Sequence, residues 1–110
     1  MSTWSVETLG KQVDDELDAL PADMRARFVY VSGLLEEFGP HKVGMPHVRS
    51  LGKKLWEIRF SGRDGIARAI YLIAVERKII VAHVFIKKTQ KTPENAIATA
   101  VNRLRQARLL

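Results

Sequence analysis

The chain contains no cysteine, which excludes a disulfide scaffold, a thiolate zinc site and catalysis by a thiolate. It has no apolar run of about 18 residues, so the sequence predicts no membrane-spanning helix. The N-terminal Met-Ser-Thr-Trp lacks the basic start and apolar run of a signal peptide. We therefore expect a cytoplasmic protein that does not enter a membrane.

Several catalytic motifs are also missing. There is no glycine-rich phosphate loop, no GxSxG sequence, and no carboxylate pair in the basic part of the chain that would hold two metal ions. The three histidines, at positions 41, 47 and 83, do not have metal-ligand spacing. We expect neither a metal nor a cofactor, so any hydrolytic chemistry must be metal-free.

Length and composition indicate one globular domain over residues 1–110. The chain has 110 residues, of which 46% are hydrophobic and 27% are charged, which are ordinary values for a folded domain. Its formal net charge is +6, and the charge is divided unevenly. Residues 1–40 carry three basic and eight acidic residues, whereas residues 41–110 carry fifteen basic and four acidic residues. The second part therefore provides the surface for an anionic partner, unless it is only a solvated basic face.

The apolar pattern predicts an α+β fold. A helix is indicated by Leu9, Val13, Leu17 and Leu20, and a second helix runs from Pro21 to Phe38, where Gly39-Pro40 ends it. Together they form a helical hairpin with one apolar face. Strands are predicted at residues 4–9, 55–60, 66–75 and 78–86, the last three as an antiparallel meander whose centre is covered on both sides. Residues 41–54 read as a basic loop, and a third helix starts at Thr92-Pro93-Glu94 with Thr92 as its N-cap. The order is β-α-α-β-β-β-α, with the hairpin packed on a twisted antiparallel sheet.

Two sets of basic residues are candidates for binding phosphate. Lys87, Lys88 and Lys91 directly precede a helix N-terminus, where they could meet an anion or could simply make the end of a strand soluble. Arg59 and Arg68 lie among apolar neighbours within strands, where a charge needs a partner or an open groove. Either a carboxylate, from Glu57 or Glu76, pairs with Arg68, or the arginines form a phosphate clamp.

Other polar residues have weaker signals. His47 lies in the basic loop with Lys53 and Lys54, where it could meet a nucleotide. His83 is expected to be a hydrogen-bonded core residue, and Tyr71 a core residue whose hydroxyl is satisfied at the rim.

Metal-free cleavage is feasible for RNA because the 2′-hydroxyl is an internal nucleophile. The protein needs only to remove its proton, neutralise the pentavalent phosphate and protonate the 5′-oxygen. Lysines crowded among arginines have a lowered pKa, which suits a base that works near neutral pH.

Several segments resemble the RelE/ParE toxin superfamily, in particular the HigB-like, phage-derived branch of type II toxin–antitoxin modules. They are LWEIR at 55–59, ARAIY at 67–71, HVFIKKTQKTP at 83–93 and the closing residues 100–103. The resemblance implies a small α+β toxin that cleaves mRNA on the ribosome and is neutralised by an antitoxin, commonly a helix-turn-helix protein. It also implies that Arg59 and Arg68 bind phosphate. Lys87, Lys88 and Lys91 stand where the family has basic residues, after the last strand.

The chain departs from the family pattern at two points. Glu57 stands where many members have a basic residue, and the C-terminal tyrosine of some members is missing. We predict that Arg68, Arg59 and Lys88 are catalytic, with a lysine of the 87–91 cluster or a histidine as the base. RNA binding is predicted for Lys87, Lys91, Lys53, Lys54 and His47. The alternatives are a ParE-like inhibitor of DNA gyrase and a catalytically silent RNA-binding module.

Overall fold

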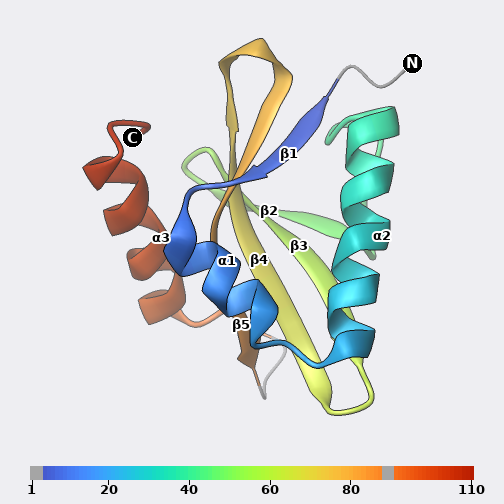
Figure 1. Cartoon of the computed structure of the whole chain (residues 1–110). Helices are drawn as coiled ribbons and strands as arrows, with labels where there is room; N and C mark the ends of the chain where they lie inside the picture. The colour runs from blue at the N-terminus through green and yellow to red at the C-terminus, as the bar shows by residue number, and fades with distance from the viewer. Residues whose placement is uncertain (1–3, 88–90) are drawn as a thin grey trace.

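A five-stranded sheet forms the centre of the computed structural model, which describes residues 4–87 and 91–110 (Figure 1). Along the chain the elements are β1 (Ser5–Thr8), α1 (Lys11–Asp18), α2 (Ala22–Phe38), β2 (Val48–Gly52), β3 (Leu55–Gly62), β4 (Gly65–Ala74), a 3-10 turn (Val75–Arg77), β5 (Lys78–Lys87) and α3 (Glu94–Gln106). The strands lie in the spatial order β1-β5-β4-β3-β2. The predicted α+β fold is therefore confirmed.

The predicted meander of β3, β4 and β5 is antiparallel throughout. The predicted first strand is also present and lies at the edge of the sheet, but it pairs with β5 in parallel, so the sheet is mixed. This pairing covers only Lys78 to Val81 of β5, because β1 ends at Thr8. Beyond this pairing β5 contacts α1, where the backbone N–H of Val84 donates a hydrogen bond to Glu16.

The sequence predicted that residues 41–54 form a basic loop, but this segment contains the strand β2. This strand pairs antiparallel with β3, with Arg49 opposite Glu57. The connection is the two-residue turn Lys53-Lys54, and both residues have positive φ, as a type I′ hairpin turn requires. Asn-Gly is the sequence that predicts such a turn, and lysine is uncommon in this conformation. The turn was therefore not predicted.

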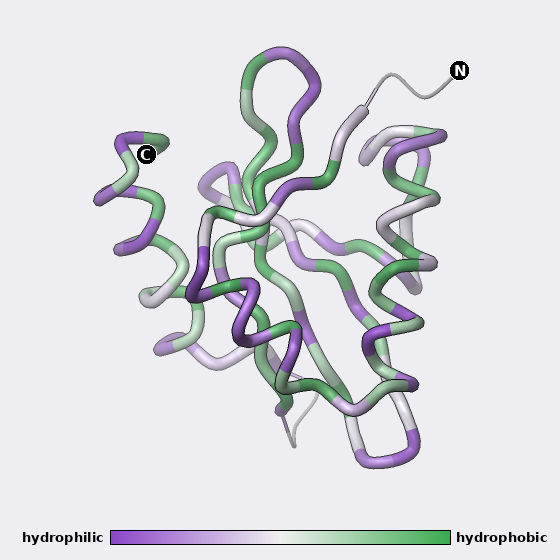
Figure 2. The backbone as a smooth tube through the Cα atoms, in the orientation of Figure 1, coloured by the Kyte–Doolittle hydropathy of each residue, from purple (hydrophilic) through white to green (hydrophobic). Residues whose placement is uncertain are grey.

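Helices cover both faces of the sheet, as expected for strands that are apolar on both sides. Figure 2 shows hydrophobic residues concentrated in the central strands, and Figure 1 shows α2 and α3 on opposite sides of the sheet. Apolar residues of α1 and α2 pack on one face in a cluster that includes Val13, Met24, Phe28, Ile58 and Tyr71. The other face is covered by Ala96, Ala100 and Leu104 of α3, which pack on Leu55, Ile70, Leu72 and Ala82. No helix in the described part of the chain is long and apolar enough to cross a membrane.

The helix ends follow the expected pattern in part. Gly39 ends α2 with a φ of 82°, and a Cβ at this position would lie 2.8 Å from the indole nitrogen of Trp4. Glycine is therefore required there for its conformation and for the close approach of the indole. Thr92, by contrast, does not cap α3. Pro93 is the N-cap residue, and the Thr92 hydroxyl donates a hydrogen bond to Glu57 instead.

Candidate nucleic-acid interface

Charged side chains occupy the part of the sheet face beyond the apolar contacts of α3. In the β3–β4 ladder Arg59 lies opposite Arg68, two residues after the pair Glu57 and Ile70. Side chains alternate between the faces of a strand, so both arginines and Glu57 project from the same face as Ile70 and α3. The neighbouring strands add one residue each, and we call the resulting set the charged cluster: Arg49, Glu57, Arg59, Arg68 and Lys87.

Glu57 lies at the centre of the charged cluster and is only 1% exposed. Its Oε2 atom is 3.6 Å from both Nη1 of Arg59 and Nε of Arg68. Its other oxygen, Oε1, accepts the hydrogen bond from Thr92. Glu57 is thus the structural carboxylate that the sequence left as one of two possibilities for Arg68. The other possibility, Glu76, is wrong because Glu76 is exposed and lies 4.0 Å from Lys78.

The two arginines are held by charge but are incompletely hydrogen-bonded. Nη1 of Arg59, Nε of Arg68 and Oε2 of Glu57 are buried and have no hydrogen-bond partner among the described residues. Arg68 makes one hydrogen bond, from Nη1 to the carbonyl oxygen of Ala67 at 2.9 Å. A buried polar group without a partner is costly, and an arginine fork matches the oxygens of a phosphate. Both arginines also line a groove, where an anion could accept hydrogen bonds from their other guanidinium nitrogens.

Burial and mutual repulsion weaken the basicity of this cluster. Burial lowers the pKa of Arg68, which is 3% exposed, and the positive charge of Arg59 lowers it further, against the opposite effect of Glu57. Burial also lowers the pKa of Lys87, which is 6% exposed, and Arg68 and Arg59 add to this shift. The cluster contains four basic groups and one carboxylate, so it remains strongly positive.

Two grooves meet at Arg59. The first, of about 390 Å³, lies between the end of β3 and the segment before β2, and its lining includes Arg27, His47 and Arg68. The second, of about 540 Å³, lies between β2 and the start of α3, and its lining includes Arg49 and Lys91. Because Arg59 lines both grooves, they form one basic path across this end of the sheet.

The structure brings several of the predicted site residues together. Arg59, Arg68 and Lys87 belong to the charged cluster, and Lys91 lines the second groove. His47 lines the first groove, and its carbonyl oxygen accepts a hydrogen bond from the backbone N–H of Arg59 at 2.7 Å.

The remaining predicted residues are not placed in the site. Lys53 and Lys54 are exposed in the β2–β3 turn. Lys54 precedes Arg59 by five residues, a separation of roughly 16 Å along an extended strand. Lys88 lies outside the described residues.

Four residues of the site were not predicted. Arg27 reaches it from α2, which lies in the acidic first part of the chain, and Arg49 reaches it from the unexpected strand β2. Thr92 was interpreted as a helix cap and Glu57 as a departure from a family pattern. For Glu57, the sequence analysis did predict pairing with an arginine as one possibility, because a buried charge in a strand needs a partner.

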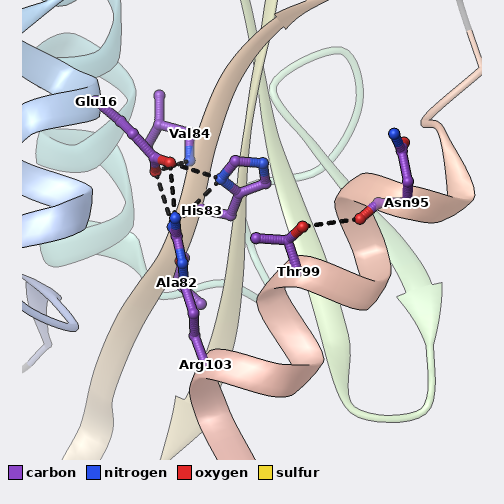
Figure 3. Close-up of polar contacts among 7 residues, drawn as sticks. All are labelled: Glu16, Ala82, His83, Val84, Asn95, Thr99 and Arg103. Carbon is purple, nitrogen blue, oxygen red and sulfur yellow. Dashed lines mark hydrogen bonds and ion pairs between the residues drawn. The ribbon is translucent and has the colours of Figure 1, made fainter.

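A second polar network joins α1 to α3 across the edge of β5, where β1 has ended (Figure 3). The carboxylate of Glu16 accepts hydrogen bonds from both terminal nitrogens of Arg103 and from the backbone N–H of Val84, all at 3.0 Å. Nδ1 of His83 also lies 3.0 Å from Glu16. His83 is therefore hydrogen-bonded, as predicted, but it is half-buried beside a pocket rather than part of the core. The prediction for Tyr71 was half right, because Tyr71 is buried in the core but its hydroxyl has no partner among the described residues.

Comparison with known proteins agrees with this architecture. Residues 15–105 match the model of the family described as phage derived protein Gp49-like (DUF891), so the chain belongs to the Gp49-like family. The fold resembles a mutant of the E. coli toxin RelE in the free state, with a TM-score of 0.67 at 15% identity over 94% of this chain and 99% of that chain. It also resembles the archaeal RelE–RelB complex from Pyrococcus horikoshii OT3, with a TM-score of 0.56 at 26% identity over 76% of this chain and 94% of that chain. No curated protein sequence matches the chain significantly. The expected membership of the RelE/ParE toxin superfamily and its phage-derived branch is confirmed.

Proposed function

We propose that this protein is the toxin of a type II toxin–antitoxin pair and that it cleaves mRNA on the ribosome in the cytoplasm. The observation that carries the proposal is the neighbouring pair Arg59 and Arg68, which line a basic path of two grooves. The RelE-like fold supports the same function, because one of the similar structures is that of the E. coli toxin RelE.

The proposed reaction is an intramolecular transphosphorylation. The 2′-oxygen of one nucleotide attacks the neighbouring phosphorus, and the bond from phosphorus to the 5′-oxygen of the next nucleotide breaks. The products are a 2′,3′-cyclic phosphate and a 5′-hydroxyl, so the 2′-hydroxyl proton leaves and the 5′-oxygen gains one. Arg59 and Arg68 would neutralise the pentavalent phosphate, a type of stabilisation that contributes about 10²–10³ in rate for one good donor.

Among the described residues, Lys87 is the best candidate for the base that takes the 2′-hydroxyl proton. Its pKa is lowered by burial and by Arg68, so a larger fraction is neutral at physiological pH than for an exposed lysine. Lys88 follows it in the chain and remains a proposed catalytic residue. Lys91 and His47 would bind the RNA on either side of the cleaved bond, together with Arg49 and Arg27 in the same grooves. Lys53 and Lys54 would bind RNA further from this bond.

The expected protein partner is a cognate antitoxin, and we propose a small helix-turn-helix protein. The similarity to the archaeal complex of RelE with RelB supports the existence of such a partner.

The test is in vitro translation of a defined mRNA with and without ribosomes, followed by mapping of the new 5′ ends and detection of a 2′,3′-cyclic phosphate. We expect cleavage only with ribosomes. Arg68→Ala should slow cleavage about 100- to 1,000-fold. Arg77→Ala, which removes the same charge from the exposed β4–β5 turn, should cleave at the wild-type rate.

Other outcomes would contradict the proposal. An Arg68→Ala protein that cleaves at the wild-type rate would refute the role of the arginine pair. Intact mRNA and normal translation would refute the nuclease function. An assay of gyrase supercoiling would then separate a ParE-like inhibitor from a silent RNA-binding module.

A further inference from the structure

A third pocket, of about 310 Å³, lies next to the charged cluster, between the end of β5 and the first turns of α3. Its lining includes His83, Phe85 and Lys87 from β5 and Asn95 and Thr99 from α3. Phe85 lies directly opposite Arg68 in the β4–β5 ladder, so the pocket begins one strand away from this arginine. Its volume equals that of about ten waters in the liquid, which is sufficient for a planar heterocycle.

The wall of this pocket contains two stacked rings. The ring centroids of His83 and Phe85 are 4.9 Å apart, and the ring planes are inclined by 24°. The two residues are separated by one position in β5, so both side chains lie on the same face of the strand. Single-stranded RNA is commonly bound through bases that stack on such aromatic side chains, because every base offers a π-face.

The network at the edge of β5 fixes the orientation of the His83 ring. Glu16 holds its Nδ1 atom, and Arg103 and the backbone N–H of Val84 hold Glu16 in turn. Figure 3 shows this network on one side of the imidazole ring, with Thr99 on the other side. A side chain that is already oriented loses little conformational entropy when a ligand binds, which favours affinity.

Polar groups of α3 lie at the opposite wall. Asn95 is exposed, and its side-chain amide makes no hydrogen bond to any other residue that the structure describes. An amide offers both a donor and an acceptor, which is the combination that reads the edge of a base. Thr99, one turn further along α3, donates its hydroxyl hydrogen to the carbonyl oxygen of Asn95.

We propose that Phe85 and His83 form a stacking platform for one nucleobase of the RNA, a role that depends on the proposed function. The nucleotide is a neighbour of the cleaved bond, because the platform adjoins Arg68. Asn95 contacts the edge of the stacked base, and Glu16 is a positioning residue for the platform.

The test compares Phe85→Leu with the wild type and with Val29→Ala, an exposed apolar truncation on α2 at the other face of the sheet. Single-turnover cleavage is measured on ribosomes carrying a short mRNA that is either intact or lacks the base at one position near the cleaved bond. Leucine keeps an apolar side chain but has no π-face. We expect Phe85→Leu to cleave intact mRNA about 5- to 150-fold more slowly, and Phe85→Tyr to cleave it at nearly the wild-type rate.

The abasic substrates identify the stacking. At one position, loss of the base should slow cleavage by the wild type and by Val29→Ala. It should not slow cleavage by Phe85→Leu beyond the effect of the substitution itself. The inference is overturned if folded Phe85→Leu cleaves like the wild type, or if the loss of a base slows both proteins equally at every position.

Failure of the proposed function gives a different result. If the wild type does not cleave at all, fluorescence anisotropy with a labelled single-stranded RNA tests the platform alone. Weaker binding by Phe85→Leu to the intact RNA, with no difference for an abasic RNA, would support the platform. Equal binding by both proteins to both RNAs would refute it.

Discussion

Substitution of Glu57 by glutamine tests how the charged cluster is held together. Glutamine has the shape of glutamate and keeps an oxygen that can accept the hydrogen bond from Thr92. It removes the negative charge that lies 3.6 Å from both Arg59 and Arg68. The variant therefore leaves the buried guanidinium of Arg68 and the half-buried guanidinium of Arg59 without their counter-ion.

The expected loss of stability is large. At 3.6 Å, and with an effective dielectric constant of about 20, each ion pair has a gross energy of about 5 kcal/mol. The cost of burying the charges offsets much of this energy, and removal of one partner from a buried pair typically costs about 3–5 kcal/mol. For a domain of this length, we expect the midpoint of thermal unfolding to fall by about 12–20 °C.

The assay measures thermal unfolding of the wild type and Glu57→Gln with increasing sulfate, and with sodium chloride at matched ionic strength. An anion that binds only the folded state stabilises it in proportion to the logarithm of its concentration over its dissociation constant. Because Glu57 no longer competes for the arginines, sulfate should stabilise the variant more than the wild type. Glu76→Gln, an equal charge change at a site that is 79% exposed, should alter stability by less than about 1 kcal/mol.

Two results would refute this reasoning. A Glu57→Gln protein as stable as the wild type would show that the carboxylate does not hold the arginines. An equal response of both proteins to sulfate would show that Glu57 does not occupy the place of an anion.

Four further substitutions test other parts of the structure. Burial raises the pKa of Glu16, but the hydrogen bonds from Arg103 and other donors outweigh this effect and lower it below the usual 4.5, so the ionised form stabilises the fold above that pH. In urea unfolding, Glu16→Gln should cost about 2–3 kcal/mol at pH 7, and this difference should shrink as the pH falls through the lowered pKa of the wild type. Tyr71→Phe should leave the free energy of unfolding unchanged or raise it by about 1 kcal/mol, because the buried hydroxyl has no partner among the described residues. If this substitution instead lowers the free energy of unfolding by more than about 1 kcal/mol, the hydroxyl has a hydrogen-bond partner. Gly62→Ala should lower the midpoint of thermal unfolding, because its Cβ would lie 2.6 Å from a carboxylate oxygen of α2. Gly33→Ala, whose Cβ would meet nothing within 4 Å, should raise that midpoint instead.

The apolar pattern predicted the elements that bury apolar side chains. The three helices and the meander each have a clear period, and their packing against one another confirms what the period indicated. β2 was not predicted because its own five residues do not indicate a strand. The strand is defined by its pairing with β3 and by the turn at Lys53-Lys54. Thr92 was misread as a cap because local sequence cannot show that a buried carboxylate 35 positions away binds its hydroxyl.

The candidate site was predictable only as a set of basic residues. Arg59 and Arg68 were identified because a charge within an apolar strand needs an explanation, and the register places them opposite each other. Arg27 was not identifiable, because an arginine on a surface helix is ordinary until the tertiary structure brings it to a groove. The same holds for the stacked rings of His83 and Phe85, which are recognisable only as a pair with a pocket beside them.

The carboxylate of Glu57 links the charged cluster to the start of α3. One of its oxygens faces the two arginines, and the other is bound by Thr92, two residues before the first residue of α3. A phosphate bound by the arginines would accept hydrogen bonds from them and would repel the negative charge of Glu57. Because Thr92 donates a hydrogen bond to Glu57, a movement of Glu57 that keeps this hydrogen bond would also move the start of α3, which forms a wall of both the second groove and the stacking pocket. A glutamate at this position therefore need not indicate a lost active site, because it can couple the binding of one phosphate to the shape of the grooves beside it.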